Sequence, residues 1–288
     1  MKRSAGPFGF PWIVVPLILL AGALVSQAAF AQSPEEIVRK VVGNELWYAD
    51  HDHSCWMYRD AYKSPAKNVI RMVIQTHQGN LSEIIEDSGH PPSPQEHEAD
   101  MSHMQQIVDD PVMRARMRRN DQNDDRQAAD LLNLLPNAFI WRLDGRENGT
   151  IKLSYHPDPN FSPPSMSARV LAAMSGIILV DESQMRLKEI DGRLDSPVEF
   201  AWGLLGRINA GGTFNVVREE IAPYEWQITQ THVHISGHAL FFKNIGDQED
   251  EWTSDYHRVP DSVNLEKADE MLRDGEAARE MHLSVPFG

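Results

Sequence analysis

Two closely spaced histidine pairs have the residue types and spacing that best fit metal chemistry. One residue separates His232 from His234, so in a strand both imidazoles would point to the same face, about 7 Å apart. Such a pair binds zinc or copper when further ligands lie opposite. His51 and His53 flank Asp52 near the expected end of a helix, where histidine also interacts favourably with the helix dipole. A metal-dependent enzyme using His232 and His234 is one hypothesis, and polar surface histidines without a metal are the other.

The motifs of common catalytic and cofactor-binding classes do not occur in the chain. We find no Gly-x-Ser-x-Gly, no His-Glu-x-x-His, no Gly-x-x-x-x-Gly-Lys, and no Gly-x-Gly-x-x-Gly after an expected strand. The glycine-rich stretch 203–212 falls inside a series of strands, where turns and close backbone packing explain glycine. We therefore favour a non-catalytic protein and expect no cofactor.

Aromatic side chains suggest binding more than catalysis. Most of them fall within expected strands, where they either fill an ordinary core or line a space for an apolar ligand. The candidate ligand-binding residues are Trp56, Tyr58, Phe139, Trp141, Phe214 and Trp226.

Composition limits the class of protein. The chain has 288 residues, of which 41% are hydrophobic and 24% charged, as is usual for a globular protein. Its 42 acidic and 27 basic residues give a net charge of −15, which disfavours binding to nucleic acid. One cysteine, Cys55, excludes a disulfide framework within the chain. We expect this thiol to be buried and inert because no positive residue adjoins it.

The first 31 residues have the pattern of a secretory signal peptide. Lys2 and Arg3 precede an apolar stretch at 12–25, and Ala29 and Ala31 give a small-x-small cleavage site. The alternative is a transmembrane anchor, but the stretch is shorter than the roughly 20 residues that span a bilayer. The sequence thus predicts export to the periplasm or the extracellular space, and a mature protein in solution.

The remaining chain, 32–288, has the pattern of one α+β domain. A capping box at Ser33 predicts a helix that ends near residue 50. A hairpin follows over 56–76, and a polar helical insertion is expected over about 81–135, with a break at 90–92 and a second capping signature at Ser93. From residue 136 onward, period-two alternation dominates, and a short amphipathic helix near residue 265 closes the chain.

About ten strands with regular turn signals indicate a large curved antiparallel sheet, an incomplete β-barrel, covered by the helices. In 226–236 the apolar parity switches, from Trp226 and Ile228 to Val233 and Ile235. A β-bulge, or a strand that passes from one covering layer to another, would explain this switch.

Several segments resemble a recurring set in secreted bacterial proteins of uncharacterised function. They are 176–194, 198–214, 237–243 and 254–260. By strand order, this group is similar to the outer-membrane lipoprotein-sorting (lipoprotein localisation factor) superfamily. The resemblance implies an incomplete antiparallel barrel, helices over its open concave side, and a concavity for acyl chains. The resemblance identifies no functional residue in this chain.

We therefore expect a monomeric periplasmic protein that binds or carries a lipid, a lipoprotein acyl chain or another apolar molecule by reversible burial. It would make transient contacts in the envelope and bind no nucleic acid. The alternatives are the metal-dependent enzyme and an envelope scaffold that docks a partner through the helical insertion.

Overall fold

The computed structural model describes residues 32–200, 206–239 and 248–283. The chain divides into two units, Met1–Gln32 and Ser33–Gly288, and the elements below belong to the second. The predicted signal peptide, residues 1–31, lies outside the described residues, as does part of the segment 237–243.

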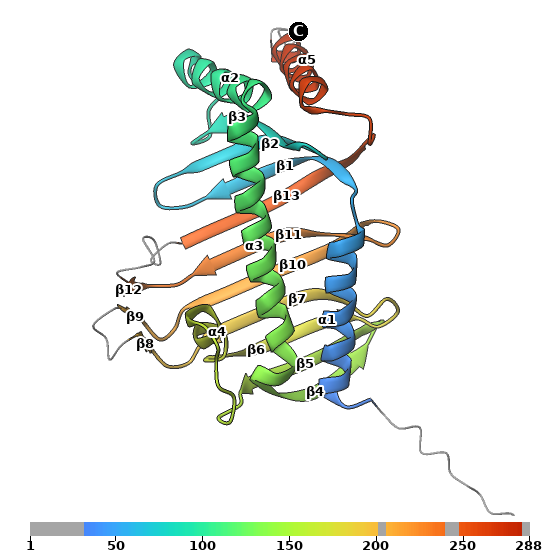
Figure 1. Ribbon diagram of the computed structural model, residues 1–288, viewed down its shortest axis with the longest axis vertical. Coiled ribbons are helices and arrows are strands. Elements are labelled where there is room, and N and C mark those ends of the chain that lie inside the picture. Colours follow the sequence, from blue (N-terminus) through green and yellow to red (C-terminus); the bar gives the residue numbers. More distant parts are fainter. Residues whose placement is uncertain (1–31, 201–205, 240–247, 284–288) are drawn as a thin grey trace, which may run out of the picture. The chain divides into compact units, whose positions relative to one another are not determined.

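Within the described ranges, the fold is an open ten-stranded antiparallel sheet with five helices (Figure 1). In spatial order the strands are β3 (Gly79–Asp87), β2 (Asn68–Thr76), β1 (Cys55–Lys63), β13 (Gln248–Val259), β11 (Glu225–His234), β10 (Thr213–Ala222), β7 (Arg186–Leu194), β6 (Met174–Asp181), β5 (Thr150–Pro157) and β4 (Phe139–Glu147). A small second sheet consists of β12 (Gly237–Ala239), β9 (Gly206–Ile208) and β8 (Val198–Phe200). The predicted fold class is confirmed.

Helices α1 and α2 begin where the capping signals at Ser33 and Ser93 predict. They are α1 (Pro34–His51), α2 (Pro94–Asp109), α3 (Pro111–Ala138), α4 (Met166–Leu171) and α5 (Leu265–Leu283). Ser33 and Ser93 form complete capping boxes, in which the Glu36 and Glu96 carboxylates accept hydrogen bonds from the N–H groups of the cap residues. These bonds satisfy N–H groups that have no partner inside a helix.

The expected start of the helical insertion is wrong. Residues 79–87 form strand β3, which pairs along its length with β2. Leu81 lies opposite Ile74, and both are buried against α2 and α5. The β-branched pair Ile84 and Ile85 favours a strand, but the polar residues around it masked the period-two pattern. The helices of the insertion are therefore α2 and α3, from residue 94 onward.

One row of directly opposed residues crosses all ten strands and changes from apolar to polar side chains along its length. From β4 to β3 it reads Leu143, Leu153, Ile178, Ile190, Val216, Thr231, Glu251, Tyr62, Val69 and Asp87. Opposed residues share a face of the sheet. This face is therefore apolar from β4 to β10 and turns polar at β11 and β13.

The apolar part of this face is filled by helices. Ile37 and Val41 of α1 and Leu135 of α3 pack against Leu153, Ile178 and other buried residues of β4 to β7. In Figure 1, α1 and α3 cross this face of the sheet. The interior over β4 to β7 is therefore packed side chains.

A second core lies on the opposite face of the sheet, over β1 to β3. Cys55 and Met57 belong to this core, whereas Tyr62 lies on the other face because successive side chains of a strand alternate. Leu265, Ala268 and Leu272 of α5 and Met104 and Ile107 of α2 cover it. Met113 and Met117 place the start of α3 against the second core, while the end of α3 lies in the first.

A glycine pair allows two aromatic rings to lie across neighbouring strands in the first core. Gly176 of β6 lies opposite Gly192 of β7, with Tyr155 and Phe214 as the next residues on either side. The Tyr155 hydroxyl donates to the Asp191 carbonyl at 2.8 Å, across the glycines. A Cβ on Gly176 would sit 1.9 Å from the same carbonyl oxygen.

Gly176→Ala is expected to destabilise the protein by about 3 kcal/mol or more, because the clash involves backbone that cannot rotate away. Urea unfolding at pH 7 measures the loss. Gly145→Ala is the matched control: a Cβ there meets nothing within 4 Å, so the change should stay within about 0.5 kcal/mol. Equal stability of the two variants would contradict the close packing of this row.

Candidate functional site

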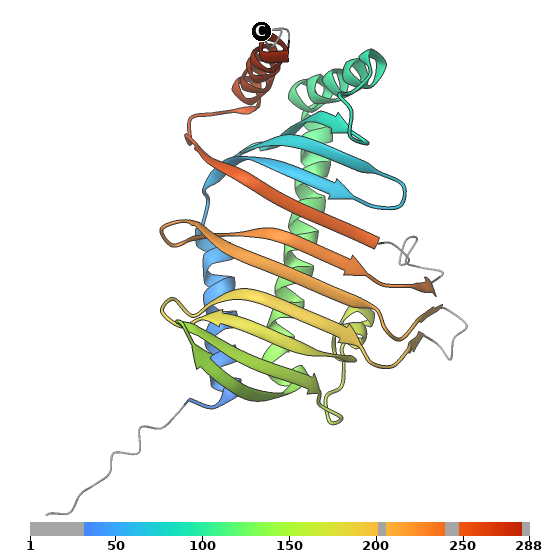
Figure 2. The ribbon, with the colours of Figure 1, turned by 180° about the vertical axis from the view of Figure 1, so that it is seen from behind.

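In the middle of the sheet, the neighbouring strands β11 and β13 separate, and we call this point the fork. In the described part of the chain, β11 pairs with β13 from Gln230 opposite Trp252 to His234 opposite Gln248. Beyond this point β11 follows β10 and β13 follows β1. Figure 2 shows the two strands parting toward the turn between β10 and β11. The fork coincides with the change from apolar to polar residues along the cross-sheet row.

A cavity of about 320 Å³ lies at this fork. The two separated strands supply most of its wall, and β1, β2 and β10 supply the rest. Its lining residues are Tyr58, Gln75, Arg218, Gln227, Ile228, Thr229, Gln230, Thr231, Glu251, Thr253 and Tyr256. The volume is within the range of small-molecule sites, and the lining mixes charged, hydroxyl and amide groups with Ile228 and two tyrosines. We call this space the fork cavity.

Side chains replace the missing main-chain pairing at the fork. The carbonyl of Ile228 accepts hydrogen bonds from the Thr253 hydroxyl at 2.6 Å and the Tyr256 hydroxyl at 3.0 Å. Arg258 donates to Glu225 at 3.0 Å farther out. The strands can separate because the Ile228 carbonyl still finds donors.

The parity switch predicted for 226–236 is a β-bulge in this wall. Val217 of β10 lies opposite Gln230 and Arg218 lies opposite Ile228, so Thr229 has no residue opposite it. Thr229 is 8% exposed, and its hydroxyl oxygen is buried without a hydrogen-bond partner among the described residues. The bulge therefore places an unpaired hydroxyl group in the cavity wall.

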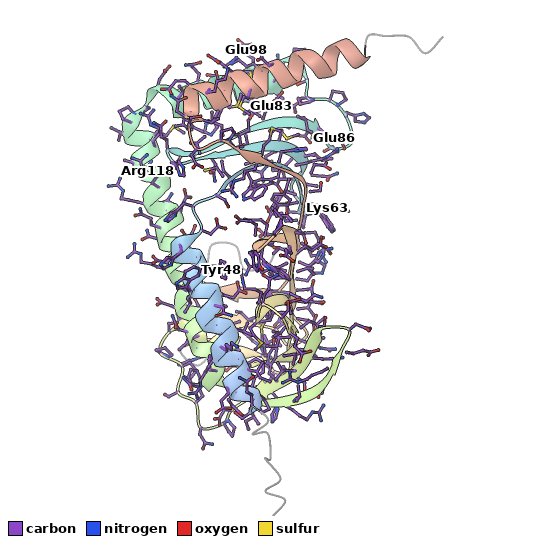
Figure 3. The ribbon with its side chains drawn as sticks, turned by 90° about the vertical axis from the view of Figure 1, so that its right-hand side faces the viewer. Tyr48, Lys63, Glu83, Glu86, Glu98 and Arg118 are labelled. Carbon is purple, nitrogen blue, oxygen red and sulfur yellow. The ribbon has the colours of Figure 1, made fainter. Side chains whose placement is uncertain are left out.

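A buried ionic cluster joins α1 to the cavity. Arg186 donates from Nε and Nη2 to the Glu45 carboxylate at 2.9 and 3.1 Å, and the Leu187 N–H donates to it at 2.7 Å. Arg218, which lines the fork cavity, donates to the same carboxylate. Glu45 and Arg186 are 5% and 2% exposed, and the Arg186 guanidinium lies 3.9 Å from the centre of the Tyr48 ring. Figure 3 shows Tyr48 on α1.

The charges of this cluster do not cancel. Burial alone would raise the pKa of Glu45, but the hydrogen bond from Arg186 and the charges of Arg218 and Arg186 bring that pKa below its ordinary value. Glu45 is therefore an anion between two cations at neutral pH. The cluster has one positive charge in excess.

The wall across the fork has the opposite balance. Asp60 is 3% exposed and forms an ion pair with Arg71 of β2. Burial and the neighbouring charge of Asp60 raise the pKa of Glu251, which lines the cavity. Burial likewise raises the pKa of Tyr58, which stacks on Tyr256 with ring centres 5.2 Å apart.

A second hollow of about 350 Å³ opens beside α1. Its lining includes Trp47, Tyr224 and His77, and the Glu225 and Arg258 pair that crosses the fork. Trp47 and Tyr224 are 54% and 64% exposed. Exposed aromatic rings therefore flank the outer end of the fork.

The six aromatic candidates do not gather in one place. Phe139 and Trp141 are buried in the first core, where Trp141 donates to the Leu135 carbonyl at 3.1 Å. Phe214 packs against that core beside Gly192. None of these three lines the fork cavity.

The other three candidates lie around the fork. Tyr58 lines the cavity. Trp56 is buried beside Tyr256, with ring centres 6.2 Å apart. Trp226 is buried, and its indole N–H donates to Gln184 at 3.0 Å while its carbonyl accepts from Arg218. Of the six candidates, only Tyr58 thus lines the cavity.

His232 and His234 lie together on one face of β11, as their spacing predicts. Both rings hydrogen-bond to the same Asp250 oxygen, at 2.8 and 2.9 Å. Over the residues that the structure covers, no group of three or more His, Cys, Asp or Glu side chains is arranged to hold a metal ion. Cys55 is buried, and burial raises the pKa of its thiol.

Sequence reasoning missed Glu45, Arg186 and Arg218. Glu45 falls within the apolar stripe of α1, next to Leu46. A carboxylate at such a position needs a buried partner, and this was the signal in the sequence that could have pointed to the cluster. Its partners are 141 and 173 residues away along the chain, so local spacing could not identify them.

Glu45→Gln is expected to reduce the free energy of unfolding by about 3–5 kcal/mol at pH 7, because Arg186 would remain buried without its counter-charge. The pKa of Glu45 is lower in the folded state than its ordinary 4.5. Its contribution is therefore complete above that value and is lost as the pH falls through the folded pKa. The difference between wild type and variant should shrink below about pH 4.5.

Guanidinium unfolding across pH 3–7 measures this effect. Glu98→Gln, on the exposed surface of α2 (Figure 3), is the matched control and should behave as wild type. A Glu45→Gln variant as stable as wild type at pH 7 would contradict the role of the cluster.

Comparison with known proteins gives one structural likeness. No protein-family model matches the chain, and no curated protein matches it. A solved domain from Vibrio parahaemolyticus, described as an outer membrane lipoprotein-sorting protein domain, aligns with 82% of this chain and 99% of its own, at 10% identity and a TM-score of 0.32. At this identity and TM-score, the likeness supports no conclusion about fold, ligand or activity.

Among the described helices, none combines the length and apolar character needed to cross a membrane.

Proposed function

We propose that this chain is an exported, non-catalytic binding protein of the cell envelope that holds a small amphipathic molecule, such as a lipid, in the fork cavity. The observation that carries the proposal is the fork cavity itself. It lies where the sheet ceases to be packed against α1 and α3, and where β11 and β13 separate.

The lining supports an amphipathic ligand better than a purely apolar one. Ile228 is 47% exposed and, with the rings of Tyr58 and Tyr256, offers apolar surface. Gln75, Arg218 and Glu251 offer polar groups on the same lining. Burial of apolar surface contributes roughly 25 cal/mol per Å², and a few polar groups then fix the orientation of the ligand.

The rest of the sheet face that α1 and α3 cover supports this location. From β4 to β7 the space between sheet and helices is occupied by the first core. A ligand there would have to displace buried side chains such as Ile178 and Leu153, which are 2% and 0% exposed. Binding at the fork requires no such displacement.

The wild-type protein is expected to bind a dansylated undecanoic acid, with increased probe fluorescence. Thr231→Trp places an indole in the cavity lining and should weaken this binding about tenfold or more, because the ligand and the new ring compete for one space. Titration at a fixed probe concentration measures both dissociation constants.

Thr213→Trp makes the same substitution at an exposed position of β10 and should leave the dissociation constant unchanged. Two outcomes would refute the proposal: a wild-type protein that leaves the probe fluorescence unaltered, or a folded Thr231→Trp variant that binds as tightly as wild type.

A further inference from the structure

The two walls of the fork cavity differ in charge. On the β10 side, Arg186 and Arg218 share the single carboxylate of Glu45. On the β1 side, Asp60 and Glu251 lie near the single cation of Arg71. The cavity is thus polarised, with its positive end at Arg218.

Arg186 is enclosed by the protein, whereas Arg218 lines the fork cavity. Arg186 is almost wholly buried against Tyr48 and binds Glu45 with two nitrogens. Arg218 donates to Glu45 and, at 3.0 Å, to the Trp226 carbonyl. Within the described part of the molecule, each arginine also has one buried nitrogen without a partner, Nη1 of Arg186 and Nε of Arg218. Of the two arginines, Arg218 is therefore the one that brings positive charge to the cavity wall.

A second unused donor lies in the same wall. The Thr229 hydroxyl belongs to a side chain that is more than nine-tenths buried, and it has no partner among the described groups. Leaving a buried donor unpaired destabilises the folded protein. Guanidinium N–H and hydroxyl O–H groups both satisfy this requirement by donating to an oxygen acceptor, and most strongly to a charged one.

We infer that the ligand of the fork cavity carries an anionic oxygen group, a carboxylate or a phosphate, which binds at the wall formed by Arg218 and Thr229. This inference rests on the proposed function and adds the chemistry of the ligand's polar end. The opposite wall, which includes Glu251, offers this group no positive charge, so the ligand has one orientation. Its apolar part lies along Ile228 and the tyrosine rings.

Four probes with the same chain and different head groups test this inference, each below its micelle concentration: dodecanoate, dodecyl phosphate, dodecanol and dodecylamine. Calorimetric titration should give dissociation constants at least about tenfold lower for the two anions than for the alcohol, since hydrogen bonds to charged groups contribute that much. The cationic amine should bind more weakly than the alcohol.

Arg218→Gln should abolish the preference for anions. Arg142→Gln is the matched control, because Arg142 is an exposed arginine of β4 paired with Asp144, and it should retain the wild-type preference. Thr229→Val keeps the side-chain shape and removes the unpaired hydroxyl. This variant should be as stable as wild type or more so, yet bind the anions more weakly, which a purely structural role for Thr229 would not produce.

The outcomes separate this inference from the proposed function. Equal affinity for dodecanol and dodecanoate would overturn the inference and leave the amphipathic site intact. Unchanged anion preference in a folded Arg218→Gln variant would also overturn it. Inorganic phosphate that binds as tightly as dodecyl phosphate would support the anion site and overturn the amphipathic ligand. Failure of all five compounds to bind would overturn both.

Discussion

The structure depends on how the backbone groups in the middle of a wide antiparallel sheet find hydrogen-bond partners. Every buried backbone carbonyl and amide needs a partner, and β11 and β13 supply each other with partners over 230–234 and 248–252 before they separate. Beyond that point the Thr253 and Tyr256 hydroxyls donate hydrogen bonds to the Ile228 carbonyl. The strands therefore diverge with the carbonyl still satisfied, and the space between them becomes the fork cavity.

The two cores explain why the separation occurs where it does. The first core lies between α1, α3 and strands β4 to β7, and the second lies on the other face of β1 to β3 beneath α2 and α5. Among the described residues, β11 contributes none to either core, and β13 contributes only Val259 to the second. Glu45 provides the connection instead, since it ties α1 to β7 and β10 through Arg186 and Arg218. A buried cluster of this kind contributes specificity more than net stability, and here it also leaves one positive charge at the cavity.

Much of the fold could be predicted from local sequence. The capping boxes at Ser33 and Ser93 fixed where α1 and α2 begin, and the parity change between Trp226 and Val233 marked the bulge at Thr229. Strand β3 was mistaken for helix, because an edge strand with polar neighbours has a weak period-two pattern. The site was harder to predict than the fold. That a residue is aromatic does not reveal whether its ring fills a core, as that of Trp141 does, or lines a cavity. The Glu45 cluster brings together residues far apart in sequence, which periodicity cannot detect.

The most direct measurement of the central claim is a crystal structure of the protein with 11-bromoundecanoate, in which the anomalous signal of bromine locates the chain of the ligand. The account predicts a bromine peak in the fork cavity beside Ile228 and Tyr58, with the carboxylate density at Arg218. Bromine located between α1 and β4 to β7, or a fork cavity that contains only ordered water, would contradict it.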